Sequence, residues 1–346
     1  MIQVSRIYKY LDKLEEDKQL FVDMLNSKDI SSSSEETFST LIPKVNSMVD
    51  INSYYNLTKK SSGNIISYTK QIPMIDTSEY TNMSYMFSGY SSLKTIPELD
   101  TSKVTNMSSM FKECSSLTTI PQLNTSNVTA MERMFDKCSS LTTIPLLDTS
   151  KVTNMSYMFI DCSSLITIPL LDTSKVTDMF YMFYNCVSLT AIPKLNTSNA
   201  LNLGLIFGSC SSLATIPQLE TSNAKNMYSM FSGCSSLTSI PQLDASNVAM
   251  LENIFKGCSS LITIGGLKDL GKAYDTTKKA NYSSYTLNLS YSNNLTHDSL
   301  INIINNLYDI ATKGCQPQSL KLGSANIEKL TEEEIAIATN KGWTVS

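Results

Sequence analysis

The sequence predicts an α/β repeat protein in which short strand–helix units stack into a solenoid. A 24-residue pattern begins at Pro73 and returns without an insertion until Gly265 replaces the proline, so eight copies fill residues 73–264. Each copy has a β-branched stretch, a polar turn and an apolar stripe that it cannot bury alone. A fixed period of this length is typical of solenoids, whose units bury their apolar faces by stacking on their neighbours.

The second copy shows which elements each repeat should contain. Residues 117–120, Leu-Thr-Thr-Ile, predict a very short strand, because Pro121 follows at once and proline cannot donate to a ladder. Residues 100–102, Asp-Thr-Ser, predict a turn. The apolar residues after this turn have the i, i+3, i+6, i+7 spacing of one face of a short helix. They are Val104, Met107, Met110 and Phe111.

Seven of the eight cysteines occupy one position of the repeat, where the first copy has Tyr90. Stacking would place them in a column about 5 Å apart, which predicts buried free thiols that act as small apolar fillers. Disulfides between neighbouring repeats are the alternative. The methionines are assigned to the core, with a methionine-rich groove as the alternative. The cysteine column comprises Cys114, Cys138, Cys162, Cys186, Cys210, Cys234 and Cys258.

At these residues the chain resembles a known family. Residues 148–165, Asp-Thr-Ser-Lys-Val-Thr-Asn-Met-Ser-Tyr-Met-Phe-Ile-Asp-Cys-Ser-Ser-Leu, closely resemble the BspA-like leucine-rich repeats of bacterial surface proteins. Leu117, Ile120 and Leu123 match the inward residues of such repeats. The resemblance covers residues 73–264 and implies a leucine-rich-repeat fold that binds protein or glycan at a surface.

The flanking regions carry a second resemblance. Residues 295–307 and 336–343 resemble the C-terminal caps of repeat proteins encoded by phages of Gram-positive bacteria. The helices predicted within residues 1–50 resemble small modules at the start of phage tail and baseplate proteins. We therefore expect a helical attachment or oligomerisation module, a linker with an N-terminal cap, the leucine-rich-repeat solenoid and a C-terminal leucine-rich-repeat-like cap. These four regions span residues 1–50, 51–72, 73–264 and 265–346.

An amphipathic helix is predicted over residues 5–27. Its apolar stripe either packs on the rest of the chain or joins subunits as a short coiled coil, for example in a homotrimer. The C-terminal region predicts strands near residues 285–290 and 319–322, a helix capped by Thr296, and a capping box formed by Thr331 and Glu334. The apolar stripe of the helix predicted over residues 5–27 consists of Ile7, Leu11, Leu14, Phe21 and Leu25.

Composition argues against several function classes. The net charge is −4 and 17% of residues are charged, so no basic stripe is available for nucleic acid. No apolar run approaches the roughly 20 residues that span a bilayer, and the N-terminus has no signal-peptide core. We therefore expect no nucleic-acid partner, no membrane insertion, and synthesis in a cytoplasm without general secretion.

No catalytic, cofactor or metal site is predicted. His297 is the only histidine, and we assign it to the exposed start of a helix, because nothing in the sequence supplies the orienting acid of a catalytic triad. The recurring aspartates, such as Asp148 and Asp172, are assigned to turns. There is no Cys-x-x-Cys motif and no glycine-rich phosphate loop. The chain is therefore predicted not to be an enzyme.

The positions that break the repeat are the candidates for binding. Register places Tyr157 beside Tyr181 and Ile160 beside Tyr184, with Phe180 adjoining them. They predict an exposed aromatic patch suited to binding protein or sugar. Scattered surface residues, or packing against the N-terminal helices, are the alternatives. A column of threonines on the strand side is a second candidate face: Thr95, Thr119, Thr143, Thr167, Thr215 and Thr263.

Together these observations predict a non-enzymatic binding or structural protein. The resemblances favour a phage tail, baseplate or fibre component in the virion. Its repeats would contact a host surface protein or glycan, and its N-terminus would join other virion proteins. The alternatives are a bacterial cell-surface adhesin and an intracellular protein-binding scaffold.

Overall fold

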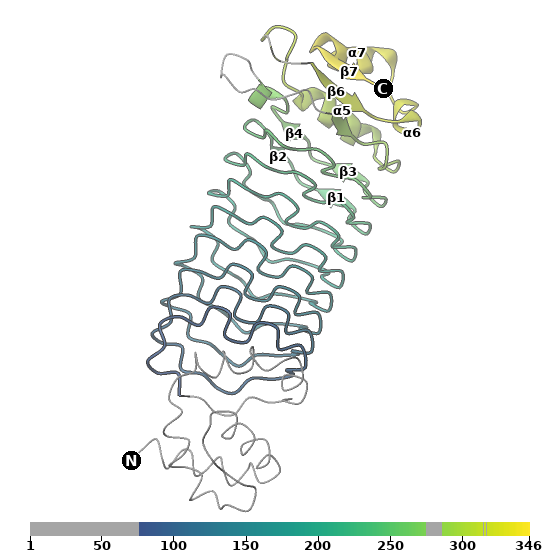
Figure 1. Cartoon of the computed structure of the whole chain (residues 1–346). Helices are drawn as coiled ribbons and strands as arrows, with labels where there is room; N and C mark the ends of the chain where they lie inside the picture. Colours follow the sequence, from purple (N-terminus) through teal and green to yellow (C-terminus); the bar gives the residue numbers. More distant parts are fainter. Residues whose placement is uncertain (1–75, 275–285, 314, 316) are drawn as a thin grey trace, which may run out of the picture.

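The computed structural model describes residues 76–274, 286–313, 315 and 317–346. It shows a stack of 24-residue repeats, closed at its C-terminal end by a small group of helices and strands (Figure 1). The repeat organisation predicted from the sequence is confirmed. The predicted helical module at residues 1–50, the linker at 51–72 and the stripe from Ile7 to Leu25 lie outside the described residues.

Backbone hydrogen bonds that run from each repeat to the next hold the stack together. In the second repeat, the N–H groups of alternate residues donate to carbonyls 23 residues further along, at N···O distances of 2.6–2.9 Å. Every other junction between two repeats retains at least three of these four bonds. The constant separation keeps all the repeats in one register. The donors of the second repeat are Met107, Ser109, Phe111 and Glu113.

The prediction of a short helix in each repeat is wrong. The segment forms successive turns, in which Met110 N–H donates to Met107 O, and Ser109 and Glu113 have left-handed φ angles of 58° and 63°. An α-helix requires each N–H to bond four residues back, whereas alternate N–H groups here bond to the next repeat. Because the turns still direct Met107, Met110 and Phe111 inward, the apolar spacing resembles that of a helix.

The left-handed conformation recurs at two positions of every repeat, from Tyr85 to Gly257, and only three of these positions hold glycine. An L-residue pays roughly 1–2 kcal/mol for this conformation. In the first seven repeats the N–H of every such residue donates to the next repeat. The inter-repeat hydrogen bond therefore offsets the local backbone strain.

The strand predicted in each repeat forms only at the C-terminal end of the stack. There β1 (Ser239–Ile240) pairs with β3 (Thr263–Ile264), and β2 (Leu243–Asp244) pairs with β4 (Leu267–Lys268), both in parallel. In the earlier repeats the predicted strand keeps at most one backbone hydrogen bond to the preceding repeat, as Thr118 N–H does to Lys94 O at 3.2 Å, and the extended residues 143–147 make none.

The proline that opens each repeat explains this difference. Gly265 takes the place of that proline, and its N–H donates to Ile240 O at 2.8 Å. Proline has no N–H to make this bond. In addition, a Cβ atom at Gly265 would collide with the backbone of Gln242, so only glycine permits the close approach of the two segments.

The core consists of columns of identical side chains. The phenylalanines from Phe87 to Phe255 stack with ring centroids 5.4–6.1 Å apart and nearly parallel planes. The seven cysteines of the repeat are free and buried, as predicted. Each thiol donates to a phenylalanine carbonyl of the preceding repeat, for example Cys162 Sγ to Phe135 O at 3.0 Å. Most of the repeat's methionines are also buried, which confirms their assignment to the core.

A small parallel sheet and its helices cover the end of the stack. The sheet has the order β5 (Thr286–Asn288), β6 (Gln318–Lys321), β7 (Trp343–Val345). The helices are α5 (His297–Asn306), α6 (Ser324–Ile327) and α7 (Glu332–Asn340), and a 3-10 turn, η2, spans Lys272–Tyr274.

Helix α5 joins this group to the last repeat. The Ser299 hydroxyl accepts from Ile264 N–H, and Thr296 N–H donates to Ile262 O. The predicted cap at Thr296 and the predicted capping box of Thr331 and Glu334 are both confirmed. None of the helices in the described ranges has the length and apolarity needed to cross a membrane.

Replacing Gly265 with proline should destabilise the end of the stack. The change removes the bond to Ile240 O and forces the ring against Gln242, so we expect a loss of about 2–3 kcal/mol. Urea unfolding followed by circular dichroism measures this loss. Pro241→Gly is the control, and its effect should stay within about 1 kcal/mol. Equal stability of Gly265→Pro and the unmodified chain would contradict the assigned role of Gly265.

The thiol column should be chemically silent in the folded chain. Burial raises the pKa of Cys114, Cys210 and Cys258 to about 12, and half-buried Cys315 lies outside the column. At pH 8 a disulfide reagent should therefore modify one thiol per folded chain, and all eight in denaturant. Reaction of several thiols without unfolding would disprove this burial.

The same thiols predict a loss of stability in alkali. In the unfolded chain they ionise near the ordinary pKa of 9.0, while the folded thiols stay protonated. The stabilisation is therefore fully present below about pH 9 and is lost as the pH rises toward 12. Replacing Cys162 with alanine should make this fall in unfolding free energy less steep.

Candidate functional site

The structure brings four of the five predicted binding residues into one cluster. The rings of Tyr157 and Tyr181 stack with centroids 5.2 Å apart and planes 6° apart. Phe180 meets Tyr181 edge-on at 4.4 Å, and Tyr184 meets Tyr181 at 4.9 Å. Ile160 occupies the position of Tyr184 in the preceding repeat and is partly exposed. These five residues are called the aromatic surface below.

The aromatic surface is half-buried, whereas the sequence analysis expected it to be exposed. The cause is that two glycines in the next repeat stand where other repeats have larger side chains. A Cβ atom at Gly204 would lie 2.9 Å from the Phe180 ring, and one at Gly208 would lie 2.9 Å from the Tyr184 ring. Both rings therefore fill space that side chains occupy in other repeats. The two glycines are a sequence signal of this arrangement.

The left-handed backbone sets the column in which the tyrosines stack. Tyr157 and Tyr181 have φ angles of 59° and 58°, and each N–H donates to the next repeat. Arg133 occupies the same position one repeat earlier, with its guanidinium carbon 3.8 Å from the centroid of the Tyr157 ring. This cation–π contact extends the column by one planar group.

Arg133 is held in place by Asp136. Their side chains form an ion pair with Nη1···Oδ2 of 3.0 Å, and the aspartate side chain is only 3% exposed. Burial raises the pKa of Asp136, and the hydrogen bond from Arg133 opposes that rise. Arg133 was not among the residues predicted from the sequence, although it occupies the same repeat position as Tyr157 and so belongs to the same column.

The tyrosine hydroxyls lie in a shared electrostatic environment. Burial raises the pKa of Tyr181, and nearby Tyr184, Tyr157 and Tyr228 raise it further. Tyr228 is 39% exposed. The Tyr228 hydroxyl, two repeats further along the chain, is therefore close enough to Tyr181 to affect its ionisation.

A second surface, the leucine pocket, lies beside the prolines. It is an open pocket of about 1070 Å³. Leu146 and Leu170 lie in adjacent repeats within it, and their side chains are 62% and 63% exposed. Sequence reasoning missed this pocket, although five other repeats have a polar residue at the same position. Those residues are Glu98, Gln122, Lys194, Gln218 and Gln242.

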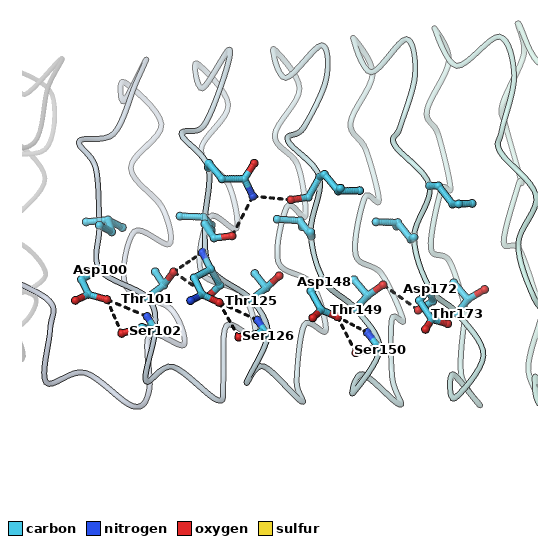
Figure 2. Close-up of a pocket in the computed structure, with 18 of the residues that line it drawn as sticks. Asp100, Thr101, Ser102, Thr125, Ser126, Asp148, Thr149, Ser150, Asp172 and Thr173 are labelled. Carbon is cyan, nitrogen blue, oxygen red and sulfur yellow. Dashed lines mark hydrogen bonds between the residues drawn. The ribbon is translucent and has the colours of Figure 1, made fainter.

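Columns of Asp-Thr-Ser turns border the leucine pocket (Figure 2). Asp148 Oδ1 accepts from both the N–H and the hydroxyl of Ser150, at 3.0 and 2.7 Å. The hydrogen bonds from serine lower the pKa of Asp148, and likewise of Asp100 and Asp172. The assignment of these aspartates to turns is confirmed.

The buried threonine of each such turn links two repeats. Thr149 donates its hydroxyl to Asp172 O at 2.8 Å, and Thr101 does the same to Asn124 O at 2.9 Å. Thr125 is also buried, but its hydroxyl has no hydrogen-bond partner. The junction between the third and fourth repeats thus lacks a bond that its neighbours have.

The other sequence candidates have structural explanations. Six of the eight repeats carry asparagine or aspartate at the position of Asn106, and the Asn106 side-chain oxygen accepts from Ser108 N–H at 2.9 Å. The threonine column from Thr95 to Thr263 is exposed. In the described ranges, no three His, Cys, Asp or Glu side chains gather as a metal site would require.

His297 lies at the start of α5, as predicted, and is 48% exposed on its side chain. Its Nε2 is 2.9 Å from Glu334 Oε1, which links the starts of α5 and α7. The hydrogen bond to Glu334 raises the pKa of His297, and the contact with Asp298 adds to it. Glu334 has a lowered pKa, chiefly because it accepts from Thr331 N–H.

The imidazole of His297 should titrate above its ordinary pKa of 6.5. In a spectrum recorded by NMR across pH, Glu334→Gln should return the pKa toward 6.5, since glutamine keeps the capping box but loses the charge. Glu333→Gln is the control. The ion pair stabilises the folded chain below pH 6.5, where His297 is protonated. This stabilisation is lost as the pH rises through the raised pKa of His297, and it is also lost in acid when Glu334 becomes protonated. An unchanged His297 pKa in Glu334→Gln would exclude the pairing.

Comparison with known proteins gives a family and a distant structural likeness. The model of a family described as "Mycoplasma protein of unknown function, DUF285" matches residues 55–170 and 166–265, well over half of the chain. No curated protein matches the chain. The crystal structure of a T. pallidum leucine-rich-repeat protein aligns at 19% identity over 61% of this chain and 82% of that chain, with a TM-score of 0.33.

Proposed function

The chain belongs to the DUF285 family of Mycoplasma proteins of unknown function, and we propose that it is a non-enzymatic binding protein. In this proposal the stack acts as a leucine-rich-repeat solenoid whose aromatic surface contacts a protein or glycan at a cell surface. The observation that carries the proposal is the cluster of Tyr157, Phe180, Tyr181 and Tyr184, which breaks an otherwise regular repeat.

Two physical features suit this cluster to binding. The rings are already ordered by stacking on one another and on Arg133, so a partner would not have to immobilise them. Tyrosine also combines a large apolar ring with a polar edge, which is why it is common in binding surfaces. Each of these side chains remains partly exposed and available for contact.

We further propose that the protein acts in a phage virion, as a component of the tail, baseplate or fibre. This part rests on the sequence resemblance of the terminal regions. Residues 1–50 would join it to other virion proteins, or to two further copies as a trimer. Detection in purified virions would support this location, and detection only in the envelopes of uninfected cells would oppose it.

Replacing Tyr181 and Tyr184 with serine should weaken partner binding while the stack stays folded. The labelled full chain can be measured by flow cytometry on a panel of intact bacteria, and on immobilised cell-surface glycans. We expect at least about tenfold weaker binding, since truncating central aromatic residues removes most of the affinity of a contact.

Tyr291→Ser provides the matched control, because Tyr291 is 50% exposed and lies outside the aromatic surface. Its binding should equal that of the unmodified chain. If the double variant bound cells and glycans as well as the control does, the aromatic surface would not be the contact.

A further inference from the structure

We propose that the leucine pocket binds an extended peptide that places an apolar side chain beside an arginine or a lysine. This site is distinct from the aromatic surface and goes beyond the function proposed above. The proposal rests on the apolar centre of the pocket, on its excess of hydrogen-bond acceptors and on the spacing of the repeats.

The apolar centre is formed by Leu146 and Leu170. Exposing more than 60% of two adjacent leucines is unfavourable in water. Both line the same shallow, open pocket, so a ligand lying along the stack can contact both. The neighbouring repeats do not share this feature, because Gln122 and Lys194 take the same position.

At the same leucines, two backbone carbonyls lack the side-chain donor that glutamine supplies in other repeats. In the third repeat, Gln122 Nε2 donates to Leu146 O at 2.7 Å, and Gln218 donates likewise to Gln242 O at 2.8 Å. A leucine cannot donate. As a result, the carbonyls of Leu170 and Lys194 receive no hydrogen bond from the described residues.

The carboxylates of the pocket add further acceptors. Asp100 and Asp148 use only one oxygen to bond serine, which leaves the second oxygen without a donor in the described part of the chain. Asp172 likewise bonds Ser174 N–H through Oδ1. Glu98 is a fourth acidic group in the lining, against one basic group, Lys194.

Three lysines stand near these turns but do not line the pocket. Lys103 pairs with Glu79 at 2.8 Å, and Lys151 donates to Asn127 Oδ1 at 3.1 Å, both in the preceding repeat. Lys175 lies close enough to Asp172 to lower its pKa. The lining itself therefore stays rich in acceptors and calls for a ligand with cationic donors.

The wall of the pocket also contains the hydroxyl of Thr125, which is buried and has no partner. Thr101 and Thr149, on either side, are satisfied (Figure 2). An unpaired buried hydroxyl is unfavourable. Because this oxygen is shielded from solvent, it weakens the junction behind the pocket and is not among the acceptors that a ligand would contact.

The spacing of the stack selects an extended peptide. In the repeats beneath the pocket, the phenylalanine centroids lie 5.4 Å apart. Alternate residues of an extended chain lie about 6.6 Å apart on one face. A peptide lying along the stack, between the row of leucines and the row of aspartates, therefore sets alternate side chains near successive repeats. Its apolar side chains point to one side, over Leu146 and Leu170, and the cationic ones between them point to the other side, toward Asp148 and Asp172.

The test uses the full chain and fluorescein-labelled peptides of twelve residues, measured by fluorescence anisotropy. The peptide of alternating leucine and arginine should bind. Peptides in which glutamate replaces arginine, or serine replaces leucine, should bind at least about tenfold more weakly. Added salt should weaken binding of the arginine peptide, because ionised carboxylates contribute to it. Equal binding of the acidic and basic peptides would overturn the proposal without any variant.

Two variants locate the site. Leu146→Gln with Leu170→Gln introduces the residue that other repeats carry at this position. The stack should therefore keep its melting temperature, and its affinity for the peptide should fall about tenfold. Asp148→Asn with Asp172→Asn should weaken binding and reduce its dependence on salt. Binding unchanged in the leucine variant would refute the proposal. Tyr181→Ser with Tyr184→Ser should still bind the peptide, which separates this site from the aromatic surface.

Discussion

The hydrogen bonds from each repeat to the next are the interaction on which the whole structure depends. A single 24-residue unit has neither a helix nor a strand of its own in most of the stack. Its alternate N–H groups find carbonyls only in a neighbour, 23 residues further along the chain. The unit therefore gains its backbone conformation and its core at the same step, when it stacks.

This constraint explains the columns in the core and the strain in the backbone. In-register stacking puts each phenylalanine on the next and each cysteine thiol on a phenylalanine carbonyl of the preceding repeat. It also fixes two left-handed residues per repeat, most of which are not glycine. Residues as large as Tyr157 and Tyr181 accept this conformation because their N–H groups are bonded to the next repeat.

The same regularity makes every departure from the repeat visible on a surface. Gly204 and Gly208 create the space into which Phe180 and Tyr184 lie. Leu146 and Leu170 leave an apolar patch where other repeats place polar residues. Gly265 replaces a proline and allows the paired strands on which α5 then packs. Sequence variation at a fixed backbone thus supplies the binding surfaces that we propose and the end of the stack.

The sequence by itself determined the period, the inward residues, the thiol column, the caps of α5 and α7, and the proximity of Tyr157 to Tyr181, because these follow from residue type and register. Only the tertiary structure decided that the apolar segment forms turns, that most extended segments stay unpaired, and that the aromatic rings are half-buried. The reason is that residue spacing shows which side chains face inward but not where the backbone N–H groups find their acceptors. In this protein the alternate N–H groups of each turn segment find their acceptors in the next repeat.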